Sequence, residues 1–308
     1  MRTRNILGQF VLLALAWGTS FLFIKIGLRA LSPAQVVLAR LVFGALALGT
    51  LLLVTRRPVP REPRVWAHLT VVAALLCVLP FLLFSVAEQR ISSGLASILN
   101  ATTPLLALTF AAAFVRGERI TRDRGIGLGL GFAGVLTIIG PWHAFEGGDL
   151  LAELACLGAT TCYGLAFAYL RRFLAGRGVA GRGMNAASLA FGQVLTGAVL
   201  MLLVTPWLPS TPVTGLDPVV VLSMLALGAF GTGFAYVWNN NIVAAWGAAN
   251  AAAVTYLSPV VGVLLGVLLL DEPLNWNQPL GAVLVVLGIL AAHGRLRVLR
   301  GSGFLRGR

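Results

Sequence analysis

Two cationic side chains lie inside long apolar segments of this chain. Lys25 is about one turn from the end of one segment, and Arg40 is about two turns into the next. A cation within a bilayer costs about 2.5–3.5 kcal/mol, so it normally faces a cavity or a partner. The two residues would together attract a carboxylate or phosphate. The alternatives are extension of the side chains to the lipid headgroups, or ion pairs with Glu88 or Glu153.

Polar residues precede two prolines that fall in the middle of apolar segments. They are Asn100 and Thr103 before Pro104, and Thr255, Tyr256 and Ser258 before Pro259. Proline frees the carbonyl group about four residues earlier, and freed carbonyls and hydroxyls can line a polar site within a membrane. We therefore expect these residues to line a binding cavity. The alternative is that they only join helices, at about 0.6 kcal/mol per contact.

Two aromatic residues, Trp17 and Tyr163, occupy corresponding places in two similar parts of the chain. Aromatic walls would suit an apolar side chain, or an ammonium group through cation–π attraction. We include both as cavity candidates, although interfacial anchoring and core packing are commoner roles for such residues.

The elements that must hold these residues are membrane-spanning helices. Hydrophobic residues make up 58% of the 308 residues, charged residues only 11%, and the mean hydropathy is +0.91. Soluble domains carry about 25% charged residues, and about 20 apolar residues span a bilayer. The sequence predicts an all-α integral membrane protein with ten transmembrane helices, at residues 8–28, 34–54, 66–87, 93–115, 124–142, 149–170, 185–205, 218–238, 248–270 and 276–293.

The chain divides into two similar halves, 1–146 and 147–308, with five predicted helices each. The fourth helices align through Pro104 and Pro259, and the fifth through pairs of glycines such as Gly127 and Gly281. An odd number of spans per half means that the second half enters the membrane in the opposite direction. We therefore predict two inverted five-helix repeats, with the binding site where they meet.

The net charge of +13 arises mainly from the loops on one side of the predicted membrane. If the N-terminus is cytoplasmic, 19 of the 23 basic residues fall at cytoplasmic positions. This asymmetry follows the positive-inside rule and places both termini in the cytoplasm. The basic excess therefore indicates topology in a bacterial-type plasma membrane, with the lipid bilayer as partner and no nucleic acid.

Enzymatic motifs are missing from the sequence. It contains no Walker A motif, HExxH, CxxC or GxSxG, and the three cysteines lack the spacing of metal ligands. We expect no catalytic residue, metal or cofactor. Glu88 and Glu153 are predicted to lie at the outer membrane surface, where they would be solvated.

These features together resemble a known family. The run Trp17-Gly18-Thr19-Ser20-Phe21 with Lys25, the pair Ala39-Arg40, and the blocks from Pro104 to Glu118 and from Pro259 to Glu272 are similar to the EamA family of the drug/metabolite transporter superfamily. The resemblance covers nearly the whole chain as two tandem EamA units, 1–146 and 147–308. It implies transport through a ten-helix bundle, without naming a substrate.

The leading hypothesis is a secondary transporter or exporter of a small metabolite, an amino acid or related carboxylate, working by alternating access. A sugar-phosphate or nucleotide-sugar carrier would need more cations, and the first span lacks the buried carboxylate that small multidrug exporters of the superfamily have. A membrane-embedded enzyme or a non-transporting scaffold are the alternatives from other classes. The oligomeric state is left open, and a monomer would suffice.

Overall fold

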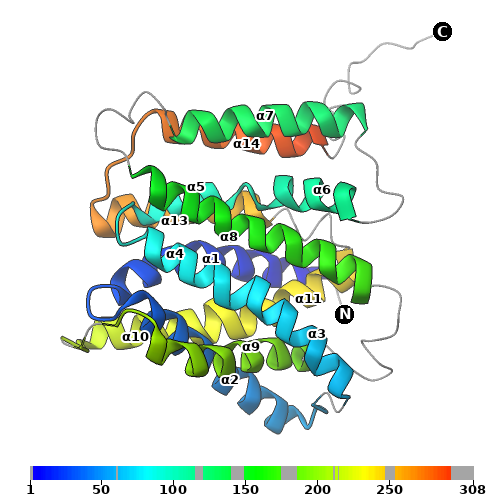
Figure 1. Cartoon of the computed structure of the whole chain (residues 1–308), viewed down its shortest axis with the longest axis vertical. Coiled ribbons are helices and arrows are strands. Elements are labelled where there is room, and N and C mark those ends of the chain that lie inside the picture. Colours follow the sequence, from blue (N-terminus) through cyan, green and yellow to red (C-terminus); the bar gives the residue numbers. More distant parts are fainter. Residues whose placement is uncertain are drawn as a thin grey trace.

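The computed structural model describes residues 3–59, 62–114, 121–139, 149–174, 186–210, 212–213, 215–246 and 254–292. Within these ranges the regular secondary structure is entirely helical, as predicted. The helices run side by side in Figure 1, with the N-terminus at one end of the bundle. We call that end the N-terminal side. The opposite end carries the short connections α1–α2 and α4–α5 and is called the α4–α5 side.

The first half contains seven α-helices and one π-helix among its described residues. They are α1 Thr3–Gly27, α2 Pro33–Thr55, α3 Pro63–Ala73, the π-helix η1 Ala74–Val78, α4 Leu79–Ala87, α5 Ser93–Asn100, α6 Thr103–Phe114 and α7 Arg122–Ile139. The described elements of the second half are α8 Leu150–Tyr169, the π-helix η3 Leu170–Leu174, α9 Ala186–Val204, the 3₁₀-helix η4 Thr205–Trp207, α10 Pro218–Gly228, the π-helix η5 Ala229–Phe234, α11 Ala235–Trp246, α13 Val254–Leu270 and α14 Asn277–Ala292.

Each of the ten predicted apolar segments contains helix in its described part. Seven continuous helical stretches of this part are long and apolar enough to cross a membrane. The other three segments hold α7, which begins with three charged residues, and the shorter α13 and α14. The number of ten membrane-crossing helices therefore stays a prediction.

Pro104 and Pro259 fall in the middle of two predicted spans, with different results. Pro104 follows a break between α5 and α6, and the Asn100 carbonyl accepts a hydrogen bond from the Thr103 hydroxyl at 2.8 Å. The predicted single helix over 93–115 is thus two helices in line, because proline cannot supply the missing donor. Pro259 instead lies inside the continuous helix α13.

A tight turn joins α1 to α2 and fixes where α2 begins. The Ser32 side chain and backbone bond reciprocally with Gln35, and Pro33 is the first helical residue. This capping box satisfies donors that the first helical turn leaves open, and proline favours that position because its φ is already helical. The start of α2 is therefore sharply defined, and Arg40 lies two turns beyond it.

The two halves pack against each other through corresponding helices. α1 of the first half packs on α13, and α8 of the second half packs on α6. Likewise α2 packs on α10 and η5, while α9 packs on α3 and η1. The helices that would correspond in two repeats therefore make corresponding contacts, so the interface between the halves lies at the centre of the bundle.

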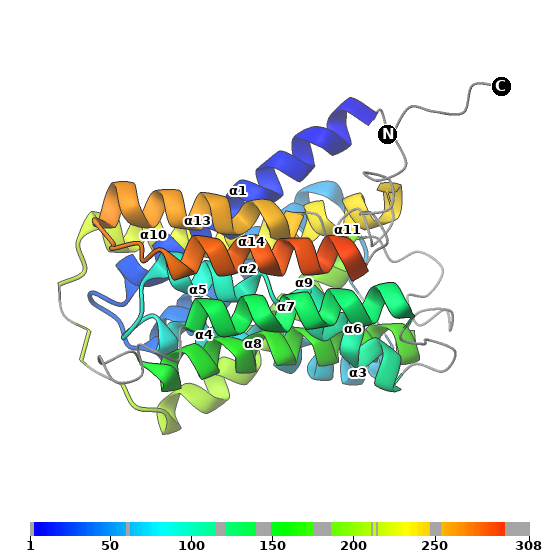
Figure 2. The same ribbon diagram turned by 90° about the horizontal axis from the view of Figure 1, so that it is seen from above.

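Helices α7 and α14 form a separate pair at the top of Figure 1, and Figure 2 shows the same pair from above. Gly127 lies against Gly288, and Gly134 lies against Gly281. Residue numbers rise along one helix as they fall along its partner, so the two helices are antiparallel. The glycines permit this approach because they leave no side chain between the backbones.

We expect Gly288→Ala to destabilise the protein. A Cβ atom at Gly288 would lie 2.6 Å from the Gly127 carbonyl oxygen and from the Gly131 nitrogen, and neither backbone atom can yield easily. Such overpacking costs about 1–3 kcal/mol. Thermal unfolding of the detergent-purified variant would reveal a lower midpoint.

The matched control is Gly129→Ala on α7, where a Cβ atom would meet nothing within 4 Å. Its midpoint should stay at or above that of the unmodified protein. Equal midpoints for the two variants would show that the close α7–α14 contact does not stabilise the fold.

Candidate functional site

A cavity of about 240 Å³ lies at the interface between the two halves. Its walls combine aromatic and aliphatic side chains with a small number of polar groups, as is usual for sites that bind small molecules. The polar and aromatic residues that line it are Trp17, Ser20, Phe21, Arg40, Phe81, Phe84, Asn100, Thr103, Tyr163, Phe167, Gln193, Tyr236, Asn239, Asn240 and Thr255.

Arg40 is the one charged residue among the described residues that line the cavity. Its side chain is buried, with 6% exposure. Its Nε donates to the Thr232 hydroxyl at 2.7 Å, its Nη2 donates to the Gly231 carbonyl at 3.4 Å, and the guanidinium lies 3.6 Å from the centre of the Phe81 ring. No carboxylate of the described chain forms a salt bridge with it. Arg40 is therefore held in place with an unneutralised charge.

The fixed position of Arg40 has a counterpart in the other half. Arg40 on α2 binds Thr232 in the π-helix η5, and Gln193 on α9 donates to the Cys77 sulfur in the π-helix η1 at 3.3 Å. The two π-helices begin 155 residues apart, which is also the separation of Pro104 and Pro259. Local π-helical turns often occur at functional sites, and here each binds a side chain that lines the cavity, Arg40 or Gln193.

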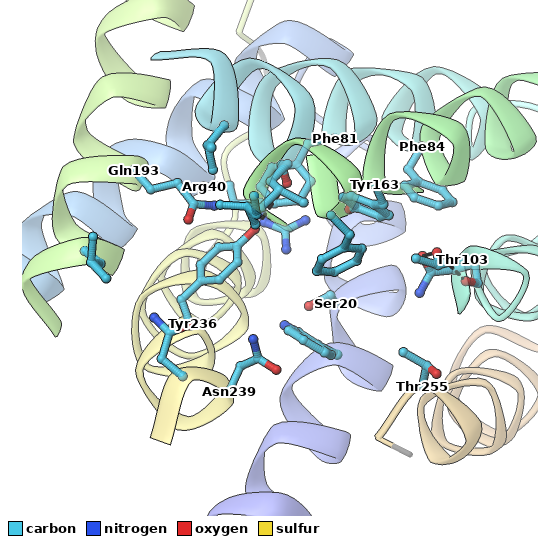
Figure 3. A pocket seen from close by; sticks show the side chains of 18 of the residues that line it. Ser20, Arg40, Phe81, Phe84, Thr103, Tyr163, Gln193, Tyr236, Asn239 and Thr255 are labelled. Atoms are coloured by element: carbon cyan, nitrogen blue, oxygen red, sulfur yellow. Dashed lines mark hydrogen bonds between the residues drawn. The ribbon is translucent and has the colours of Figure 1, made fainter. Parts of the chain in front are cut away.

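Tyr236 supplies a hydrogen bond to a backbone carbonyl group of the π-helix η1. Its hydroxyl donates to the Leu76 carbonyl at 3.2 Å. Pro80 cannot donate to that carbonyl, which lies four residues earlier. Figure 3 shows Tyr236 and Gln193 close to Arg40, so these three residues form one polar wall of the cavity.

Five polar residues that line the cavity were not predicted from the sequence: Gln193, Tyr236, Ser20, Asn239 and Asn240. A separation of 155 residues relates Phe81 to Tyr236, so extending the proline alignment to the third helices would have identified Tyr236. The amide residues carried a weaker signal, since each is a polar residue within an apolar segment.

The opposite wall holds residues that the sequence did predict. Thr103 and Thr255 lie across the cavity from Tyr236 and Asn239 in Figure 3. Asn100 and Thr255, which are 155 residues apart, both line the cavity, as do Trp17 and Tyr163. Corresponding residues of the two halves thus face the same space.

Three predicted residues have different surroundings. The Lys25 ammonium donates to the backbone carbonyls of Glu88 at 2.5 Å and of Ile91 at 2.8 Å, beyond the cavity wall. The Ser258 hydroxyl bonds back to the Val254 carbonyl in its own helix at 3.1 Å and is buried against α1. The side chain of Tyr256 lies outside the described residues.

The cavity is closed at the α4–α5 side. Phe21, Ile24 and Phe84, which line it there, are 6%, 2% and 3% exposed, whereas Asn239 and Thr255 toward the N-terminal side are half-buried. Beyond the closed end, the Glu272 carboxylate accepts hydrogen bonds of 2.8–3.0 Å from the Ser93 hydroxyl and backbone and from the Gly94 backbone. These contacts tie the end of α13 to the start of α5.

The arrangement suits a small ligand with one negative charge and an apolar part. A guanidinium offers five N–H donors, and the bonds described for Arg40 use only two of its nitrogens. Among the described residues, no group of three or more His, Cys, Asp or Glu residues could hold a metal ion.

The chain is similar to known transporters over nearly its full length. It is 28% identical over 287 residues to an uncharacterized transporter of Archaeoglobus fulgidus, covering 91% of this chain and 97% of that protein. It is 28% identical over 303 residues to the uncharacterized inner membrane transporter YedA of Escherichia coli K12, covering 94% and 92%. It is 26% identical over 287 residues to an E. coli K12 protein named "Probable amino-acid metabolite efflux pump", covering 91% of each.

A solved crystal structure has the same fold, with a TM-score of 0.61 and 19% identity over 96% of this chain and 99% of that one. The EamA-like transporter family matches twice in tandem, at residues 6–140 and 150–292. Together with the apolar helices, these matches identify a multi-pass membrane protein, and the chain belongs to the EamA-like transporter family.

Proposed function

We propose that the protein is a secondary transporter of a small carboxylate metabolite, with amino acids as the leading class, and that the cavity around Arg40 is its substrate site. The observation that carries this proposal is the buried Arg40 guanidinium, which lines the cavity without a carboxylate partner among the described residues. A substrate carboxylate would supply the missing charge through charge-assisted hydrogen bonds.

The rest of the lining favours an amino acid over a sugar phosphate or a cationic drug. A phosphate carries up to two charges, and Arg40 is the single cation in the described lining. No acidic residue of that lining would neutralise a cationic drug. The ammonium of an amino acid could instead contact aromatic faces and amide oxygens, and its side chain would pack against Trp17 and Tyr163.

The membrane arrangement completes the proposal. We take the N-terminal side as cytoplasmic because the basic residues favour it, so that the described cavity faces inward and the α4–α5 side is the closed outer end. The antiparallel α7–α14 pair and the corresponding helix contacts between the two halves support two inverted repeats with ten spans. One chain encloses the cavity, so a monomer in the lipid bilayer suffices, and no nucleic acid takes part.

Counterflow into proteoliposomes tests the function. Each set of vesicles is loaded with one unlabelled compound, and the same compound is added outside in labelled form. The compounds are aromatic and aliphatic amino acids, a monocarboxylate, a sugar phosphate and a cationic drug. We expect saturable exchange of at least one amino acid or monocarboxylate. Exchange of only the sugar phosphate or the drug would overturn the substrate class, and exchange of none of them would overturn the proposal of transport.

The Thr232 hydroxyl positions Arg40, and its loss should weaken substrate binding. We expect Thr232→Val to raise the KM of counterflow by about 3- to 10-fold, because a hydrogen bond contributes about 0.5–1.5 kcal/mol. Valine keeps the shape of threonine, so the maximal rate should change less. The concentration dependence of counterflow measures both quantities.

Thr50→Val on α2 is the matched control, since Thr50 is exposed and away from the cavity. It should leave the KM unchanged. A KM for Thr232→Val equal to that of the control would show that the bond between Thr232 and Arg40 does not support substrate binding.

A further inference from the structure

Glu88 is a completely buried acid at the closed end of the cavity. It has 0% exposure, and neither carboxylate oxygen has a hydrogen-bond partner among the described residues. The sequence predicted a solvated side chain here, and that prediction is wrong. The α4–α5 connection turns Glu88 into the protein, where α4 packs on α8.

Charged and titratable groups surround Glu88 without pairing with its carboxylate. Lys25 on α1 binds the backbone carbonyl of Glu88, and Glu272 at the end of α13 is occupied by Ser93 and Gly94. The other titratable groups that act on this region are Arg40 on α2, and Cys156 and Glu153 on α8.

A carboxylate in such a place favours its neutral form. Burial of an unpaired charge is costly, and the group responds by holding its proton. Glu88 follows the last residue of its span, and burial raises its pKa well above the ordinary value, while Lys25 opposes that shift. The closed arrangement described here therefore favours the protonated form of Glu88.

Glu88 also lies where the closed end must open. It is one turn beyond Phe84, which lines the cavity, and it is next to the carbonyl groups that hold Lys25. We define the outer gate as Lys25 with its carbonyl partners on Glu88 and Ile91, together with the Glu272–Ser93 contact. Alternating access requires these contacts to part, which would admit water to the Glu88 carboxyl group.

We propose that Glu88 is a proton-binding site linked to the outer gate. The closed gate holds the neutral carboxyl group, and the open gate lets it ionise and release the proton to the outside. This inference rests on the proposed function, since it assumes alternating access. Because the open state binds fewer protons than the closed state, a higher external pH favours opening and a lower external pH favours closure, by up to about tenfold per pH unit.

The test is the alkylation of a cysteine placed in the gate. The three native cysteines are replaced by alanine, and Ile91→Cys, at a site 7% exposed, reports opening to a membrane-impermeant maleimide added outside the cell. Gln89→Cys, at an exposed site, corrects for the pH dependence of the thiol itself. We expect the corrected rate to fall as the external pH is lowered.

Glu88→Gln mimics the protonated side chain. It should give a low alkylation rate at every pH, whereas Glu88→Asp should keep the pH dependence. The control Glu62→Gln, at the exposed start of α3, should behave like the unmodified protein. A corrected rate independent of pH with Glu88 present, or a pH dependence that survives Glu88→Gln, would overturn the proposal.

If Glu88→Gln fails to fold, the Ile91→Cys protein still tests the proposal, because the pH dependence of its alkylation is measured with Glu88 intact. The assay uses no substrate, so it also separates the two proposals. Carboxylate exchange without a pH-dependent gate would contradict the role of Glu88 alone. A pH-dependent gate without exchange of any carboxylate would contradict the proposed substrate class alone.

Discussion

Replacing Arg40 by glutamine is expected to reduce the counterflow of carboxylate substrates by about 10- to 100-fold. The side chain keeps much of its length and polarity but loses the positive charge. Hydrogen bonds to charged groups contribute about 1.5–3 kcal/mol, and every 1.4 kcal/mol corresponds to a tenfold change in binding. The effect should be large because Arg40 is 6% exposed and is the single cation in the described lining.

Initial counterflow rates at subsaturating substrate would measure this change. Arg29→Gln is the matched control, because Arg29 is exposed in the α1–α2 connection and outside the cavity. Both variants should elute as folded protein from a sizing column. If folded Arg40→Gln exchanges carboxylates at the rate of the control, Arg40 does not bind the substrate.

Filling the cavity should block transport as strongly as removing its charge. Asn239 lines the cavity, and Figure 3 shows its side chain pointing into it. Asn239→Trp would place a large ring in a space of about 240 Å³, which leaves little room for an amino acid. We expect a loss of counterflow of about tenfold or more, because a substrate displaced from the site loses its contacts with Arg40.

The control for this variant is Leu222→Trp in the same membrane span. Leu222 is 63% exposed on α10 and does not line the cavity around Arg40, so a larger side chain there leaves that cavity unfilled. This protein should transport normally. Counterflow that survives Asn239→Trp in folded protein would mean that the substrate takes another route through the bundle.

The helical fold was predictable because membrane-spanning helices have a simple signature of length and hydrophobicity. The place of Asn100, Thr103 and Thr255 at the cavity was predictable for a related reason. Asn100 and Thr255 lie at corresponding positions of two repeats, and repeats that meet at a central interface bring corresponding residues together.

Helix rotation and depth were harder to infer from the sequence. Lys25 and Ile24 are neighbours in the chain, yet Ile24 lines the cavity while Lys25 binds the α4–α5 turn. Ser258 is buried against α1 because its helix face turns away from the cavity. Hydropathy depends on composition alone and does not resolve a rotation of about 100° between adjacent residues.

The partners of polar groups on other helices could not be inferred from the sequence either. Gln193 binds Cys77, and Tyr236 binds the Leu76 carbonyl, and each of these pairs joins the two halves. Glu88 was misjudged because its place at a span end suggests solvent, whereas the fold of the α4–α5 connection buries it.

The most direct test of the account is the preference of the unmodified protein for a carboxylate over the matching carboxamide. Counterflow of a labelled amino acid is measured in competition with the unlabelled amino acid or its amide, which differ only at the group that Arg40 would bind. We predict that the amide competes about tenfold or more weakly, because it lacks the charge that strengthens hydrogen bonds to a guanidinium. Equal competition by acid and amide would contradict the proposal that Arg40 recognises a substrate carboxylate.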